Sequence, residues 1–103
     1  MNDLIQKQIA ETVRDNAVVL FMKGTADEPM CGFSGTVAKI LKLLEVDFVD
    51  INVLESDDMR QGIKIFSDWP TIPQLYIRGE FIGGCDIARE MYQSGELQKL
   101  LGK

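Results

Sequence analysis

The sequence predicts an α/β fold in which four strands form one mixed sheet flanked by helices on both faces. Along the chain, short segments that are β-branched or alternately apolar are interspersed with longer segments whose apolar residues recur at the helical period. The first two predicted strands are separated by a helix, which favours a parallel pair with a right-handed crossover. The last two are separated by a single glycine, which favours an antiparallel hairpin.

The first half of the chain alternates helix, strand, helix and strand. Residues 3–15 carry apolar side chains near the helical period, with polar side chains between them. Residues 17–22 form a short continuous apolar run, which suits a strand buried on both faces. Residues 32–45 again show a helical apolar stripe after a polar loop, and residues 46–51 alternate as a second strand does.

The second half begins with a helix for which Ser56 is the predicted N-cap. Its expected buried face consists of Met59, Ile63 and Phe66. A loop over residues 67–73 then precedes two short strands, 74–78 and 80–82, which form a hairpin around Gly79. The methionines are expected in the core, where their flexible side chains fill gaps.

A last helix is predicted over residues 86–101, with Gly95 as a weak point. Its expected buried stripe consists of Ile87, Met91, Leu97, Leu100 and Leu101. The complete order, αβαβαββα, corresponds to a thioredoxin-like fold. A chain of 103 residues is the size of one domain, so residues 1–103 are predicted to form a single domain.

Composition excludes several classes of function. The net charge is −5, which disfavours binding to nucleic acid or to an anionic membrane, because both need a basic surface. The chain has no histidine, so a histidine general base and a histidine-ligated metal are excluded. Its two cysteines cannot make a four-thiolate zinc site within one chain.

The same features indicate where the protein acts. The longest purely apolar run, residues 17–22, is far shorter than the ~20 residues of a membrane-spanning helix. The N-terminal segment carries acidic residues and no apolar targeting region, and the chain begins with an initiating methionine. Two widely separated cysteines are no disulfide scaffold. We therefore expect a reducing compartment, the cytoplasm.

Cys31 is the main candidate for chemistry. It follows a buried strand and a loop and lies at the predicted start of a helix, where free backbone N–H groups and Lys23 favour thiolate over thiol. Ser34 stands where a C-x-x-C motif has its second cysteine, so a disulfide at Cys31 needs a small thiol, another protein or Cys85. The alternative interpretation is a buried, unreactive cysteine that acts as a small hydrophobic residue.

Three motifs resemble those of one family. Residues 23–34, Lys-Gly-Thr-Ala-Asp-Glu-Pro-Met-Cys-Gly-Phe-Ser, resemble the K-G-x-x-x-x-P-x-C-G-F-S signature of monothiol (CGFS-type) glutaredoxins. Residues 69–75, Trp-Pro-Thr-Ile-Pro-Gln-Leu, resemble the W-P-T-x-P-Q-L motif of that family, with Ile72 where many members have phenylalanine. Residues 83–87, Gly-Gly-Cys-Asp-Ile, match its G-G-C-D-I motif. The three motifs occur in order over nearly the whole chain.

The resemblance implies binding of glutathione and of a [2Fe-2S] cluster bridged between two subunits. It implies a role in iron–sulfur cluster assembly or transfer and in thiol redox homeostasis. The loop before Cys31 is longer than in dithiol glutaredoxins, which in the family accompanies weak general reductase activity. A BolA-family protein and apo iron–sulfur proteins are the implied partners, and the cluster-bound form is expected to be a homodimer.

Glutathione has two carboxylates, an ammonium and a thiol, so its site needs cations, backbone amides and an anion. Lys23 and Arg60 can supply the cations, and the alternative for Arg60 is an ordinary solvated helix face. By resemblance the Ile72–Pro73 bond is cis and presents the Ile72 backbone to the ligand; the alternative is an ordinary loop proline.

Cys85 and Asp86 open the last predicted helix, whose first N–H groups can take a carboxylate while Asp86 takes the ammonium. A plain N-cap is the alternative for Asp86. Phe33 and Trp69 are expected to pack against or cover the site. Cys31 is the predicted catalytic thiol and iron ligand, and the complete predicted binding set is Lys23, Cys31, Phe33, Arg60, Ile72, Pro73, Gly84, Cys85 and Asp86.

A ligand count supports the dimer. A [2Fe-2S] cluster needs four ligands, so two chains that offer Cys31 alone leave two positions for glutathione thiolates. The competing arrangement uses Cys31 and Cys85 of both chains and no glutathione. Two other functions remain open: a glutathione-dependent oxidoreductase that deglutathionylates proteins with one cysteine, and a docking module with an inert cysteine.

Overall fold

The computed structural model describes residues 3–103. This part of the chain contains four strands, five α-helices and one short 3₁₀-helix. In chain order the elements are α1 (Asp3–Asp15), β1 (Val18–Met22), α2 (Gly32–Leu43), β2 (Val49–Asn52), η1 (Val53–Glu55), α3 (Asp57–Ser67), β3 (Gln74–Ile77), β4 (Glu80–Gly83), α4 (Cys85–Ser94) and α5 (Glu96–Leu101). None of these helices is long and apolar enough to span a membrane.

The strands form a single mixed sheet in the order β2-β1-β3-β4. The pair β1–β2 is parallel, as expected for strands joined by a helix. The pairs β1–β3 and β3–β4 are antiparallel, and β3 and β4 make the predicted hairpin. The predicted thioredoxin-like fold is therefore confirmed.

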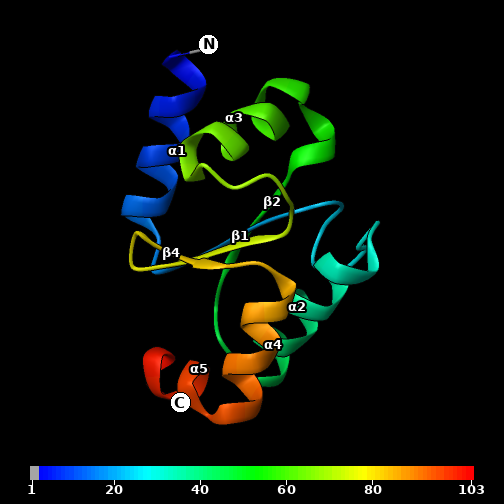
Figure 1. Cartoon of the computed structure of the whole chain (residues 1–103), viewed down its shortest axis with the longest axis vertical. Coiled ribbons are helices and arrows are strands. Elements are labelled where there is room, and N and C mark those ends of the chain that lie inside the picture. The colour runs from blue at the N-terminus through cyan, green and yellow to red at the C-terminus, as the bar shows by residue number, and fades with distance from the viewer. Residues whose placement is uncertain (1–2) are drawn as a thin grey trace.

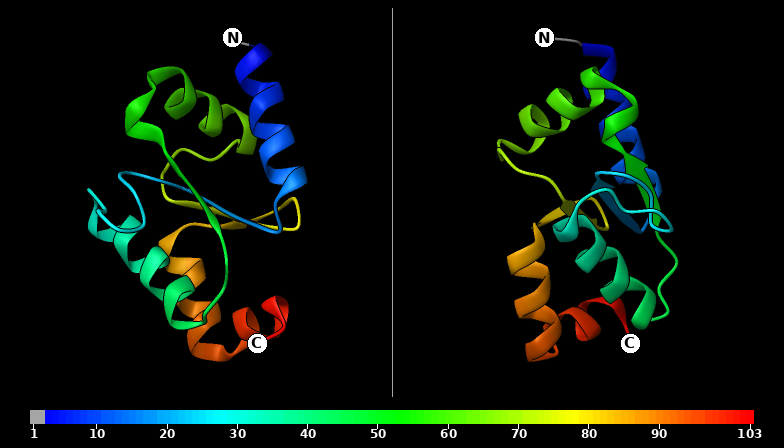
Figure 2. Two further views of the ribbon diagram at one scale, coloured as in Figure 1. Left: turned by 180° about the vertical axis from the view of Figure 1, so that it is seen from behind. Right: turned by 90° about the vertical axis from the view of Figure 1, so that its right-hand side faces the viewer.

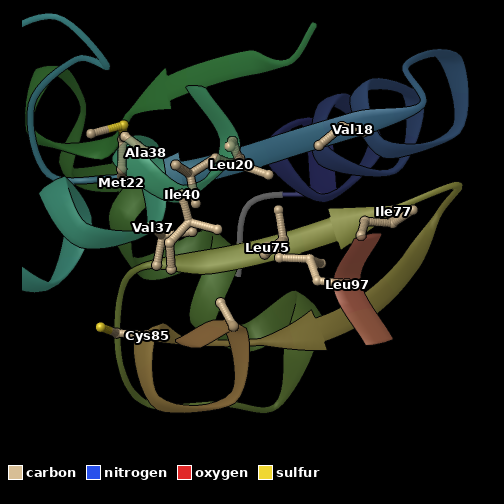
Figure 3. Packing of buried hydrophobic residues seen from close by; sticks show 12 residues of the cluster. Val18, Leu20, Met22, Val37, Ala38, Ile40, Leu75, Ile77, Cys85 and Leu97 are labelled. Atoms are coloured by element: carbon tan, nitrogen blue, oxygen red, sulfur yellow. The ribbon is translucent and has the colours of Figure 1, made fainter. Parts of the chain in front are cut away.

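Helices cover both faces of the sheet (Figures 1 and 2). α1 and α3 lie on one face, and α2, α4 and α5 lie on the other. Alternate side chains of β1 point into the two resulting cores, because successive side chains of a strand face opposite sides. Val18, Leu20 and Met22 pack with α2 and α4 (Figure 3), whereas Val19 and Phe21 pack with α1 and α3. This double burial explains the continuous apolar run of β1.

The third helix begins as predicted. Ser56 is its N-cap, and the Ser56 hydroxyl accepts a hydrogen bond of 3.2 Å from the backbone N–H of Met59. Ile63 is fully buried on the inner face of α3, and Met59 and Phe66 pack against the same core as partly buried residues.

The second strand begins later than predicted, at Val49 instead of Val46. Residues 44–46 complete the end of α2: the backbone N–H of Val46 donates to the carbonyl of Leu41 at 3.2 Å, and Glu45 has a positive φ of 56°. Val46 and Phe48 still pack against the core, so their alternation reflects burial without strand pairing.

The last predicted helix is divided in two. Gly95 adopts a φ of 86°, ends α4 and precedes α5. Ile87 was expected in the buried stripe, and that expectation is wrong, because its side chain is 42% exposed. The expectation that all methionines lie in the core is also wrong: Met22 is fully buried, but Met30 is 70% exposed beside Cys31.

Candidate functional site

A pocket of about 220 Å³ opens where the start of α4, the loop before β3 and the start of α2 meet. Its wall is mostly apolar and is formed by Phe33, Trp69, Thr71, Ile72, Pro73, Gly84, Cys85, Asp86 and Ile87. The structure thus brings together six of the predicted binding residues: Phe33, Ile72, Pro73, Gly84, Cys85 and Asp86.

The loop before β3 forms one wall of this pocket. The Ile72–Pro73 peptide bond is cis, as the resemblance implied. Gln74, the first residue of β3, is fully buried, and its Nε2 donates to the carbonyls of Trp69 and Thr71 at 3.3 and 3.1 Å. The hydroxyl of Tyr76 donates in turn to Gln74 Oε1 at 3.3 Å. A buried amide therefore holds the loop in place from behind.

The start of α4 forms the facing wall. Gly84 is the N-cap residue, and a Cβ added there would lie 3.1 Å from the carbonyl oxygen of Pro73, so the two walls approach closely. The N-cap alternative for Asp86 is wrong, because Asp86 lies in the first turn of the helix. Its exposed carboxylate pairs with Arg89 at 3.2 Å.

Cys31 does not itself line the pocket but lies two residues before Phe33, which does. It is the N-cap residue of α2, in an extended conformation and partly exposed. The thiol makes no capping hydrogen bond of its own. The pKa of Cys31 is nevertheless lowered, first by the backbone N–H of Ser34, which stabilises negative charge on the sulfur. Burial opposes this, whereas the Phe33 N–H, the Ser34 hydroxyl and the positive charge of Lys23 add to it. The predicted helix-start position of the thiol is confirmed.

Lys23 and Arg60 do not line the pocket itself. Lys23 follows the end of β1, and its charge acts on Cys31. Arg60 belongs to α3, and its guanidinium pairs with Asp57 at 3.2 Å. Within residues 3–103, the Arg60 Nε is buried without a hydrogen-bond partner. A polar atom in that state has bonding capacity left for a further group.

Cys85 differs from Cys31 in its surroundings. Both are free thiols, but Cys85 is only 7% exposed and belongs to the core between the sheet and α2. Figure 3 shows it at the margin of that core. No cluster of three or more potential metal ligands occurs within residues 3–103. The described part of one chain therefore offers a single accessible thiol and no complete metal site.

Three pocket residues lie outside the predicted binding set: Thr71, Ile87 and Trp69, for which only packing or cover was predicted. Thr71 lies in the W-P-T-x-P-Q-L motif and could have been included on that basis. Ile87 is an apolar residue in the predicted apolar stripe of the last helix, and that spacing by itself favours burial in the core. Trp69 lines the pocket with its side chain 44% exposed, and Phe33 does so with 63% exposed, which fits the predicted role as cover.

The fold and the site together define a thioredoxin-like protein with a partly exposed thiol of lowered pKa at the start of a helix. Comparison with known proteins agrees. The glutaredoxin family model matches residues 18–82. A protein of Rickettsia conorii named probable monothiol glutaredoxin 2 is 62% identical over 95 residues, which cover 92% of this chain and 89% of that protein.

Solved structures give the same result. The solution structure of reduced poplar apo GrxS14 superimposes with a TM-score of 0.83 at 54% identity, covering 95% of this chain and 90% of that one. The holo form of glutaredoxin C1 from Populus tremula x tremuloides matches with a TM-score of 0.85 at 27% identity, covering 97% and 88%. The chain belongs to the monothiol glutaredoxin family.

Proposed function

We propose that this protein binds glutathione and carries a [2Fe-2S] cluster held between two subunits, and that it acts in iron–sulfur cluster assembly or transfer and in thiol redox homeostasis. The observation that carries the proposal is the combination at Cys31. A partly exposed thiol of lowered pKa lies two residues before Phe33, which lines the pocket, in a chain whose described residues offer no complete metal site.

The pocket has groups suited to each end of glutathione. The first backbone N–H groups of α4 lie at the pocket wall, where the helix dipole favours the γ-glutamyl carboxylate. The exposed carboxylate of Asp86 can take the neighbouring ammonium, in place of or alongside its pairing with Arg89. The backbone of Ile72 can pair with the extended tripeptide as an added strand does.

The remaining carboxylate of glutathione needs a cation. Arg60 is the candidate on α3, since its Nε has no partner among the described residues. Lys23 is the candidate beside Cys31. Pro73 and Gly84 shape the pocket through their close approach, and Phe33 covers it.

The number of ligands leads to a dimer. Four ligands are needed, and Cys31 supplies one thiolate per chain. Two glutathione thiolates, one held in each pocket, complete the set. Cys85 is a poor substitute, because its side chain is buried in the core. Because half of the ligands are small and exchangeable, the cluster is cargo that can be released to an apoprotein.

The alternative is a glutathione-dependent oxidoreductase. In that reaction the Cys31 thiolate attacks the glutathione sulfur of a protein mixed disulfide and releases the protein thiol. A second glutathione then attacks the mixed disulfide at Cys31, giving glutathione disulfide and the free thiolate. The lowered pKa of Cys31 serves this route as well as the first.

Partners and location complete the proposal. Apo iron–sulfur proteins and a BolA-family protein would exchange the cluster with the homodimer. Both cysteines are free thiols, which suits a reducing compartment, and we propose the cytoplasm.

The test is purification without oxygen, followed by visible spectroscopy, light scattering and analysis of glutathione per iron, with Cys31→Ser as the matched control. We expect a coloured dimer with one glutathione per iron, a colourless apo monomer, and no cluster in the control. A holo monomer, or a dimer without glutathione, contradicts the proposal. A colourless protein that rapidly turns over a glutathione mixed disulfide supports the oxidoreductase instead.

A further inference from the structure

The loop between β1 and α2, residues 23–30, is held by side chains that lie outside the pocket. Asn52 follows Ile51 at the end of β2, and its Oδ1 accepts hydrogen bonds from the backbone N–H groups of Gly24 at 2.9 Å and Leu54 at 3.0 Å. Asp50, two residues earlier, accepts a bond of 2.8 Å from the N–H of Ala26 through Oδ2. Two side chains of one strand thus fix two amides of the loop.

A third side chain, from α2, also holds the loop. Lys42, in the last turn of α2, donates from Nζ to the carbonyl oxygen of Ala26 at 2.8 Å and to Asp27 Oδ1 at 3.1 Å. The backbone of Ala26 is therefore fixed at its N–H by a carboxylate and at its C=O by an ammonium. Both bonds involve a charged group, but only the bond to Asp50 is partly buried, whereas the bonds from Lys42 are exposed and therefore weaker.

Backbone contacts fix the rest of the loop. The N–H of Met30 donates to the carbonyl of Lys23 at 2.9 Å, and Gly24 and Pro29 form an isolated bridge. Gly24 has a φ of +88°, and a Cβ there would lie 2.5 Å from both Glu28 O and Met30 N. The end of the loop that leads into Cys31 is thereby tied to the residue that supplies the nearby cation.

We propose that Asp50 and Asn52, supported by Lys42, are positioning residues that hold this loop in one conformation and so hold Cys31 and Lys23 in place for the glutathione-ligated cluster. The inference rests on the proposed function. None of the three lines the pocket, so they act through the loop and not on the ligand. Releasing the loop is expected to shorten the lifetime of the cluster while leaving the fold intact.

The first part of the test uses the apo protein and amide hydrogen exchange measured by NMR. In Asn52→Ala the Gly24 amide is expected to exchange about tenfold faster, and in Asp50→Ala the Ala26 amide likewise, because each loses its acceptor. Asp47→Ala is the matched control, since Asp47 is an exposed carboxylate just before the same strand. This control should change the exchange rate of neither the Gly24 amide nor the Ala26 amide. Unchanged exchange in the first two variants overturns the inference.

The second part measures the half-life of the reconstituted cluster from its visible absorbance. Loss of either acceptor is expected to shorten the half-life about tenfold, the scale typical of groups that orient metal ligands from behind. Asn52→Asp and Asp50→Asn keep an acceptor oxygen, so their cluster half-lives should be close to that of the wild type. Alanine variants with faster exchange but an unchanged half-life overturn the positioning role.

Two outcomes separate this inference from the proposed function. If the wild-type protein takes up no cluster, the proposed function fails, while the exchange experiment still decides whether the side chains fix the loop.

If an alanine variant does not fold, Lys42→Met replaces it, because the Lys42 side chain is half exposed. Its expected effect on the half-life is about threefold, since exposed ionic contacts are weaker. No effect in a folded Lys42→Met protein then counts against the inference.

Discussion

The backbone N–H of Lys23 donates a hydrogen bond of 3.1 Å to the hydroxyl of Ser34. Ser34 is completely buried, so this bond connects the end of β1 to the first turn of α2 inside the protein. The residue that replaces the second cysteine of a C-x-x-C motif therefore has a structural role of its own. The same hydroxyl helps to lower the pKa of Cys31.

Replacing Ser34 with alanine should destabilise the protein, because the Lys23 N–H loses its acceptor in a partly buried place. We expect a loss of about 1–2 kcal/mol in the free energy of unfolding, measured by urea denaturation. Thr36→Ala is the matched control on the same helix, since the exposed bond of the Thr36 hydroxyl goes to the Gly32 carbonyl of its own helix. Equal losses in the two variants would show that the Ser34 bond contributes nothing specific.

The lowered pKa of Cys31 predicts fast alkylation at neutral pH. The thiolate is the reactive form, so the rate should rise with pH through the pKa and level off above it. In a Cys85→Ser background we expect a midpoint below the ordinary cysteine value of about 8.5. Lys23→Gln should raise the midpoint only slightly, because the lysine charge is the weakest of the causes. A midpoint at or above the ordinary value contradicts the prediction.

Much of the fold could be predicted from the sequence, because burial imposes local periodicity. The run over β1 faces two cores at once, and the Ser56 N-cap forms a local bond. The errors arose where apolar spacing was not specific to one structure. Val46 and Phe48 alternate like a strand but follow a helix end, and Ile87 faces the pocket where the helical pattern favours the core.

The site could be predicted only in part. Cys31 at a helix start follows from local order along the chain, and the motifs supplied most of the pocket wall. The bond between Lys23 and Ser34 and those made by Asp50 and Asn52 join segments distant in sequence. Their partners depend on strand order and helix position, which no local pattern specifies.

Cys85 is predicted to be dispensable for the cluster. Its side chain is 7% exposed and packs in the core, so Cys85→Ser should cost about 1–2 kcal/mol of stability through a buried hydroxyl. The variant should keep its cluster and its glutathione, whereas Cys31→Ser should lose the cluster. Visible absorbance and glutathione analysis of the purified proteins provide the measurement. Loss of both ligands from the Cys85 variant would assign this cysteine a direct role.

Two glycines near the thiol should respond in opposite ways to alanine. Gly24 combines a positive φ with atoms 2.5 Å from any Cβ, so Gly24→Ala should lower the free energy of unfolding by at least about 2 kcal/mol. Gly32 begins α2 with no atom within 4 Å of an added Cβ, so Gly32→Ala should be neutral or stabilising by up to about 1 kcal/mol. Denaturation curves of the two variants test the contrast, and similar stabilities would contradict it.

Tyr76 gives the protein a predicted loss of stability at alkaline pH. Burial beside Phe21 and Phe81 raises the pKa of the Tyr76 phenol to about 12, above its usual value near 10. Between these two values the unfolded chain ionises and the folded protein does not, so stability is complete below pH 10 and falls as the pH rises toward 12. We expect this group to account for about 1–2 kcal/mol of the fall.

The variant Tyr76→Phe tests this prediction. It loses the hydroxyl bond to Gln74, but it also has no phenol that can ionise, so its stability relative to the wild type should improve from pH 8 to pH 11. Urea denaturation at both pH values gives the comparison, with Tyr92→Phe as the control that leaves the Tyr76 contribution in place. A difference between Tyr76→Phe and the wild type that stays constant across this range would disprove the prediction.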